Sequence, residues 1–193
     1  LELARRGSRV VAVEPAPAFL PPLRAAARRE RLPVDARRGH ALALPLREGE
    51  RFDLALATFD VLNHLYRHED LGPALAGVAR ALRPGGHVLF DLNTPETVSA
   101  FPDHHRVTPL RGGGLSAERG SYDSATGVGT VTRDWFLPRP GAPGSFRRLR
   151  ELYREIARER AAVEAALRDA GFTARLFADA SGWLSFQPEG TRW

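Results

Sequence analysis

The stretch ALRPGGHVLFDLNTPE, residues 81–96, decides the fold. Its RPGG run, residues 83–86, is expected to stop a preceding helix, because Pro and Gly end helical patterns. The run HVLFDL, residues 87–92, is short and apolar, as strands buried on both faces of a parallel sheet are. The following Asn93-Thr94-Pro95 predicts a turn that caps a short helix beginning at Glu96.

Upstream of this stretch, apolar runs alternate with helical patterns. Strands are expected at residues 10–13, 33–37 and 52–59, and helices at residues 20–29 and 71–82. Strands that alternate with helices predict an α/β fold, in which a mostly parallel twisted sheet is flanked by helices.

The pattern changes after residue 100. Residues 102–145 are rich in Gly and Pro, and TVTRDWFL at 130–137 predicts a strand. Residues 146–157 fit either a strand or a helix, because their apolar positions satisfy both periods. A helix at 159–170 and a strand at 172–177 are expected to follow.

Composition narrows the classes of protein. The 193 residues suit one domain, with 43% hydrophobic and 26% charged residues. No apolar run is long enough to span a membrane, there is no secretory signal, and there is no Cys for a disulfide or thiolate site. A cytoplasmic location is therefore expected.

The net charge of +5 comes from 28 basic residues, all of them Arg. They are spread along the chain among 23 acidic residues rather than gathered in one segment. A nucleic-acid-binding face needs clustered positive charge, so no nucleic-acid partner is predicted.

Three stretches together resemble the class I S-adenosylmethionine-dependent methyltransferases that act on small molecules. They are LELARRGSRVVAVEPAPAFL at 1–20, RFDLALATFDVLNHL at 51–65 and the stretch at 81–96. The resemblance implies a Rossmann-like sheet, with an antiparallel insert after the fifth strand of the family. It also favours a strand at 146–157.

The resemblance implies a single domain over residues 1–193. Residues 1–100 would form the cofactor-binding core, 101–157 a strand-rich insert on the substrate side, and 158–193 a terminal helix and strand. In the family, a first strand and a GxGxG loop precede the helix that begins near Leu1, and a last strand would follow Trp193. Since Leu1 is also not Met, we expect a fragment that lacks both strands and is inactive alone.

The resemblance implies a cofactor site. Glu14 ends an apolar strand, where an acid accepts hydrogen bonds from ribose hydroxyls. His40 and Ala41 stand where the family often has an acid that meets the adenine amino group. Thr58 and Phe59 follow the 52–59 strand beside the cofactor. The structural alternatives are a solvated acid at Glu14 and an exposed loop histidine at His40.

The same resemblance puts the substrate beside the loop at 58–64. His64 is the candidate general base, because imidazole titrates near neutrality, and Asp60 and Asn63 could orient an acceptor. Asn93 and Tyr122 are candidate substrate contacts. Each also has a structural alternative, such as a turn at Asn93 or a small core in the insert around Tyr122.

Histidine spacing alone does not predict a metal site. His64 and His68 are four residues apart, and His104 and His105 are adjacent. No acids or cysteines in the sequence complete such a set around them. We therefore predict no metal.

The function implied is methyl transfer from S-adenosylmethionine to N or O of a small molecule. Two alternatives remain open. One is a non-catalytic methyltransferase-like binding domain. The other is an NAD-dependent oxidoreductase, because an acid after a strand also marks that fold. The acceptor and the oligomeric state stay open.

Overall fold

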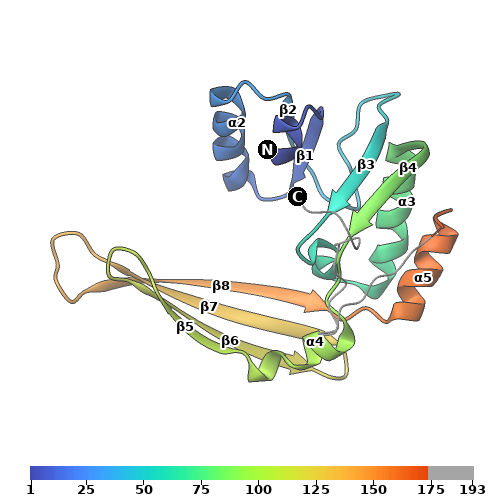
Figure 1. Ribbon diagram of the computed structural model, residues 1–193. Helices are drawn as coiled ribbons and strands as arrows, with labels where there is room; N and C mark the ends of the chain where they lie inside the picture. The colour runs from blue at the N-terminus through green and yellow to red at the C-terminus, as the bar shows by residue number, and fades with distance from the viewer. Residues whose placement is uncertain (174–193) are drawn as a thin grey trace. The chain divides into compact units, whose positions relative to one another are not determined.

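The computed structural model describes residues 1–173 (Figure 1). The regular elements are α1 Glu2–Arg5, β1 Val10–Glu14, α2 Leu20–Arg29, β2 Val34–Arg38, β3 Phe52–Ala57, α3 Leu71–Ala81, β4 Leu82–Phe90, α4 Pro95–Ser99, β5 His105–Pro109, β6 Leu115–Asp123, β7 Val128–Pro138, β8 Phe146–Ile156 and α5 Arg160–Asp169. Strands and helices alternate as far as β4, and strands dominate after it. The predicted α/β class is confirmed.

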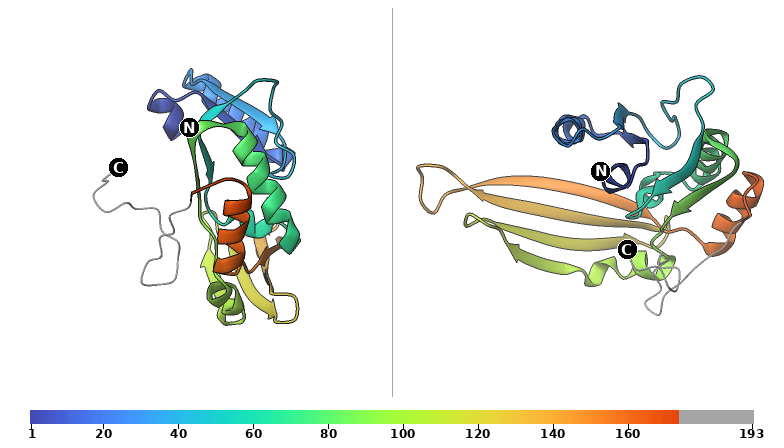
Figure 2. Two further views of the ribbon diagram at one scale, coloured as in Figure 1. Left: turned by 90° about the vertical axis from the view of Figure 1, so that its right-hand side faces the viewer. Right: turned by 45° about the horizontal axis from the view of Figure 1, so that its top comes forward.

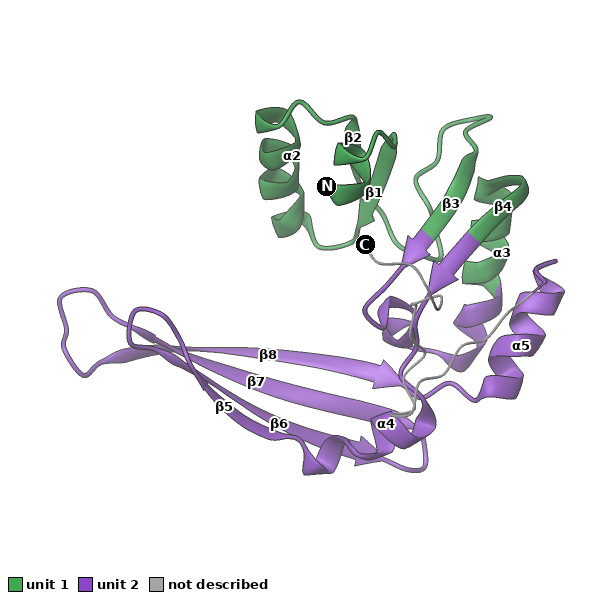
Figure 3. Cartoon of the chain, in the orientation of Figure 1, with its two compact units in different colours: residues 1–55, 73–87 green, residues 56–72, 88–193 purple. Residues whose placement is uncertain are grey.

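The chain forms two compact units (Figure 3). The first contains residues 1–55 and 73–87, and the second contains residues 56–72 and those from 88 onward. The division falls within β3, α3 and β4.

In the first unit, β1 and β2 are parallel neighbours. Their register runs from Val10 opposite Val34 to Glu14 opposite Arg38. The α2 helix buries Leu20 and Ala27, and its Arg24 donates from Nη2 to the carbonyl of Ala36 in β2 at 2.6 Å. This β–α–β unit sets Glu14 at the carboxyl end of β1, as predicted.

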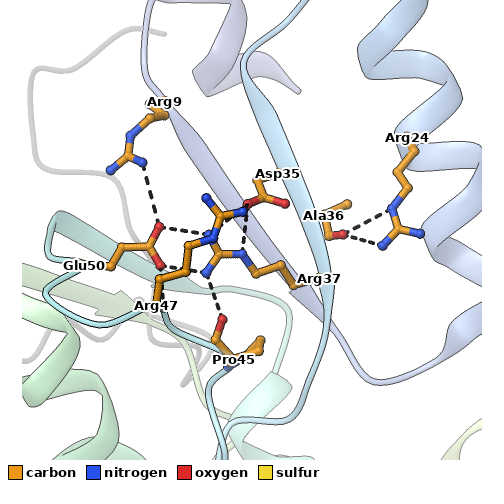
Figure 4. A network of polar contacts seen from close by, with 8 residues as sticks. All are labelled: Arg9, Arg24, Asp35, Ala36, Arg37, Pro45, Arg47 and Glu50. Carbon is orange, nitrogen blue, oxygen red and sulfur yellow. Dashed lines mark hydrogen bonds and ion pairs between the residues drawn. The ribbon is translucent and has the colours of Figure 1, made fainter.

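An ion-pair network fixes the connection between β2 and β3 (Figure 4). Arg37 donates from Nη1 and Nη2 to the two Glu50 oxygens at 2.6 and 2.9 Å, and from Nη1 to the Pro45 carbonyl at 2.8 Å. It also donates from Nε to Asp35 at 3.0 Å, while the Arg47 backbone N–H donates to Glu50 at 3.1 Å. A bidentate pair of this kind has a defined geometry, so the loop after His40 is held in one shape.

The β3 and β4 strands form a second pair, and their arrows point the same way in Figure 1. The expected boundaries were wrong here: β3 ends at Ala57, and β4 begins at Leu82 and includes the RPGG run. The α3 helix ends at Ala81, before the run, and the chain passes directly into the strand. A β-carbon at Gly86 would lie 3.2 Å from the Phe52 carbonyl, so glycine permits this close approach of the two strands.

In the second unit, β5 to β8 form a four-stranded antiparallel sheet, drawn side by side in Figure 1 and in the right-hand view of Figure 2. The predicted antiparallel insert is therefore confirmed. Residues 146–157 resolve as a strand, because β8 pairs with β7 from Phe146 opposite Pro138 to Ile156 opposite Val128. The apolar positions of this segment fit both the helical and the strand period, and its pairing with β7 along the whole length makes it a strand.

The predicted helix at 159–170 is confirmed as α5, which buries Val163 and Leu167. The strand expected at 172–177 falls mostly outside the described residues. No helix within residues 1–173 combines the length and apolar character that crossing a membrane requires.

The α4 helix and the short 3-10 helix Phe101–Asp103 contact β6 and β7 through glycines. A β-carbon at Gly120 would overlap the Phe101 carbonyl. We therefore expect Gly120→Ala to lower the free energy of unfolding by about 1–3 kcal/mol, the usual cost of overpacking.

The matched control is Gly72→Ala in α3, where a β-carbon meets open space. It should be neutral or stabilise by up to about 1 kcal/mol, because Ala is the better helix former. Denaturant unfolding of the full-length protein measures both. Equal stability of Gly120→Ala and wild type would contradict the packing described.

Hydrogen bonds from the Arg37 side chain and, to a smaller extent, from the Arg47 backbone N–H lower the pKa of Glu50 from 4.5 to about 2. A depressed folded-state pKa stabilises the protein above pH 4.5, and that stability is lost as the pH falls towards 2. Glu50→Gln should lower the melting temperature at neutral pH and reduce its fall in acid. Glu48→Gln, exposed on the same loop, should change neither. The same acid profile in Glu50→Gln and wild type would rule out this linkage.

Candidate functional site

The segment that follows β3 has an uncommon backbone. Phe59 and Asp60 are both in the left-handed region, with φ of 63° and 51°. Such angles strain non-glycine residues and tend to occur at functional sites. The Phe59 side chain is 85% exposed, so the turn leaves a large apolar side chain outside the core.

The short 3-10 helix Val61–His64 (η2) is anchored by Asn63, which is completely buried. Asn63 donates from Nδ2 to the carbonyls of Asn93 and Ile156, each at 2.9 Å. Its Oδ1 accepts from the Asn93 N–H at 2.9 Å. One amide thus joins η2, the segment after β4 and the end of β8.

Four further polar side chains gather around this anchor. Asn93 Nδ2 donates to Glu155 at 2.6 Å and lies 3.5 Å from Asp60 Oδ2. Asp91 Oδ2 accepts from the Asp60 N–H at 3.2 Å. Its other oxygen, Oδ1, is buried and has no hydrogen-bond partner among the described residues.

The hydrogen bonds of His64 set its tautomer. Its Nδ1 lies 2.8 Å from the Arg154 carbonyl, which can only accept, so Nδ1 carries the proton. In neutral His64 the Nε2 lone pair is then free, and Nε2 lies 3.8 Å from Asp60 Oδ2. This arrangement suits a proton acceptor whose protonated form is stabilised by a carboxylate.

Glu155 is 3% exposed, although it carries a carboxyl group. Burial raises its pKa from 4.5 to about 8, and the Asp60 carboxylate adds to the rise, while the hydrogen bond from Asn93 opposes it. Burial and the neighbouring carboxylate both favour the protonated form of Glu155. Ligand atoms of Asp60, His64 and Glu155 all lie within 4.8 Å of one another.

Four of the predicted site residues thus come together, namely Asp60, Asn63, His64 and Asn93. Tyr122 of β6 lies opposite Gly129 of β7, which lies opposite Glu155 of β8, so one strand separates Tyr122 from Glu155. His68 and His104 bond elsewhere, to the Thr126 carbonyl and to Glu118.

Sequence reasoning missed Glu155. The signal would have been a carboxyl group beside Ile156 and Ala157, where β8 passes from exposed to buried positions. The sequence left residues 146–157 open between a strand and a helix. The burial of Glu155 could not be predicted from it, because pairing with β7 decides which residues of β8 are buried.

Among the predicted cofactor residues, Glu14 fits its role best. One carboxylate oxygen, Oε1, accepts from the Ala16 N–H at 2.8 Å, which fixes the side chain. The other oxygen accepts no hydrogen bond within residues 1–173. An oriented acceptor at a strand end is the chemistry that ribose hydroxyls need.

His40 is exposed, and its geometry changes the expected role. The Leu42 N–H lies 3.3 Å from His40 Nδ1, so Nδ1 accepts and the neutral ring carries its proton on Nε2. Nε2 is then a donor. It suits a ring nitrogen of adenine rather than the adenine amino group, and Ala41 follows it in a turn.

Thr58 and Phe59, the other predicted cofactor contacts, belong to the second unit. Thr58 is exposed directly after β3, next to the exposed Phe59 ring. Both are accessible to a ligand at the carboxyl end of β3.

A family model described as a methyltransferase domain matches residues 1–90. This range contains the first two stretches that carried the resemblance and residues 81–90 of the third. No curated protein sequence matches the chain.

Solved structures match over most of the chain. An S-adenosylmethionine-dependent methyltransferase from Clostridium acetobutylicum matches with a TM-score of 0.75 at 17% identity, over 87% of this chain and 65% of its own. A sugar N-methyltransferase from Streptoalloteichus matches with 0.70 at 20%, over 87% and 64%. An S-adenosylmethionine-bound amino pentose methyltransferase from Micromonospora echinaspora matches with 0.66 at 23%, over 90% and 70%.

The chain thus spans about two thirds of the length of these structures. At these identities the likeness concerns the fold, and the family model covers less than half of the chain. Residues 1–90 thus match a methyltransferase-domain family model, and the chain has the fold of the class I methyltransferases.

Proposed function

We propose that this protein transfers a methyl group from S-adenosylmethionine to N or O of a small molecule. The observation that carries the proposal is the polar cluster of Asp60, His64 and Asn93 at the carboxyl ends of β3 and β4. Ligands of open α/β folds bind at that end of the strands.

S-adenosylmethionine, when bound, supplies an electrophilic methyl group on a positively charged sulfur. Glu14 would hold its ribose hydroxyls, and His40 would donate to its adenine ring. Thr58 and Phe59 are the other residues proposed to contact it. In a direct displacement the protein mainly has to align the acceptor atom with the methyl group. Such alignment can lower the activation barrier by several kcal/mol or more.

His64 would take the proton that the acceptor loses. Its Nδ1–H is committed to the Arg154 carbonyl, so Nε2 is ready to receive that proton. The Asp60 carboxylate, 3.8 Å away, would stabilise the resulting imidazolium. The names of two structural neighbours refer to a sugar N-methyltransferase and an amino pentose methyltransferase. They support a small, polar acceptor.

Calorimetric titration of S-adenosylhomocysteine into the full-length protein tests the cofactor. We expect micromolar binding and none of NAD. Glu14→Gln keeps an oxygen for the Ala16 N–H and loses the second acceptor, so binding should weaken about tenfold, the value of a hydrogen bond to a charged group.

Glu14→Ala should weaken binding at least as much, while Glu48→Gln, on an exposed part of the following loop, should bind like wild type. NAD binding in place of S-adenosylhomocysteine would favour the oxidoreductase. If neither binds, the domain is a scaffold without this cofactor.

A further inference from the structure

The acceptor atoms of Asp60, His64 and Glu155 have a spacing that suits one small cation. Three atoms no more than 4.8 Å apart can all lie about 2.8 Å from a single central atom. That is the length of a charge-assisted N–H···O or N–H···N hydrogen bond. An ammonium group has three N–H donors, one for each acceptor.

The charge of the cluster favours a cation over a neutral hydroxyl. Asp60 is a carboxylate, His64 presents a lone pair at Nε2, and Glu155 still offers its carbonyl oxygen when protonated. The buried Asp91 Oδ1, on the residue that holds the Asp60 N–H, adds an acceptor without a partner in the described chain. A hydroxyl has one donor and could reach only one of these acceptors.

We propose that the methyl acceptor is an amine that arrives protonated, that Asp60, His64 and Glu155 bind its ammonium group, and that His64 Nε2 removes its proton. This inference rests on the proposed function and names the acceptor class of that same site. Glu155, which the sequence did not indicate, completes the set of three acceptors.

The proton step balances within the cluster. One N–H bond of the ammonium breaks, and its electron pair stays on nitrogen while the proton bonds to His64 Nε2. The neutral amine then has the lone pair that methylation requires. The His64 side chain is 39% exposed, so the imidazolium can return its proton to water.

A divalent metal fits the same atoms less well. Metal binding needs carboxylates without protons, whereas burial favours the protonated form of Glu155.

Other charged groups nearby do not cancel the negative charge. Tyr153 stands edge-on to His64, with ring centroids 6.3 Å apart. Arg133 lies over the Tyr153 ring at 5.7 Å, but it is paired with Glu118 at 2.7 Å. Arg154 contributes its backbone carbonyl to His64, and its side chain is on the opposite face of β8 from Glu155.

The first test follows the Glu155 carboxyl by carbon NMR in the full-length protein labelled with [13C]glutamate. Its resonance is identified by its loss in Glu155→Gln. We expect a midpoint near pH 8 in wild type and a lower one in Asp60→Asn, because the neighbouring charge is gone. Asp169→Asn, exposed at the end of α5, should leave it unchanged. A midpoint of about 4 to 5, as in exposed glutamates, would overturn the described charge state.

The second test titrates methylammonium into the labelled protein, with and without S-adenosylhomocysteine, and follows the side-chain nitrogen signals of His64 and Asn93. Methanol is the neutral probe of similar size. We expect saturable shifts with methylammonium alone. Asp60→Asn should weaken binding about tenfold, the value of a hydrogen bond to a charged group, while Glu155→Gln, which keeps an acceptor oxygen, should weaken it less.

Three results would overturn the inference: equal shifts with methanol, no shifts although S-adenosylhomocysteine binds, or broadening of these signals by micromolar Mn²⁺. Failure of S-adenosylhomocysteine to bind would instead count against the proposed function. Methylammonium shifts in that case would still support the ammonium site. The two proposals therefore fail separately.

Discussion

The buried amide of Asn63 is the contact on which the candidate site depends. It makes three hydrogen bonds of 2.9 Å, which join η2 to the segment after β4 and to the end of β8. Each such bond contributes about 1 kcal/mol, and each buried group left without a partner costs about 1–3 kcal/mol. Asn63 therefore fixes the distance between segments that are 30 and 93 residues away in the sequence.

The chemistry of the site follows from this constraint. With η2 held against the end of β8, His64 reaches the Arg154 carbonyl, and its Nε2 is left as the acceptor. The same contact brings the Asp60 carboxylate to Glu155, whose burial favours the protonated form. A buried arginine completes the arrangement: Arg158 donates to the carbonyls of Leu65 and His68 at 2.9 Å and holds the chain after η2.

Much of the fold could be predicted from local pattern. Apolar runs and helix stops gave β1, α2, β2 and α3, because these elements depend on neighbours in the sequence. The resemblance singled out Asp60, Asn63, His64 and Asn93 as candidates, and the structure brings these four side chains together. Glu155 could not be predicted, since its burial depends on pairing with β7. The donor role of His40 Nε2 was hidden as well, because it is set by a backbone N–H two residues away.

The central claim is that the carboxyl ends of β3 and β4 form a methyl-transfer site. A crystal structure of the full-length protein with S-adenosylhomocysteine tests it most directly. The account predicts that the sulfur lies against the segment from Thr58 to His64. A sulfur bound away from this segment would contradict it.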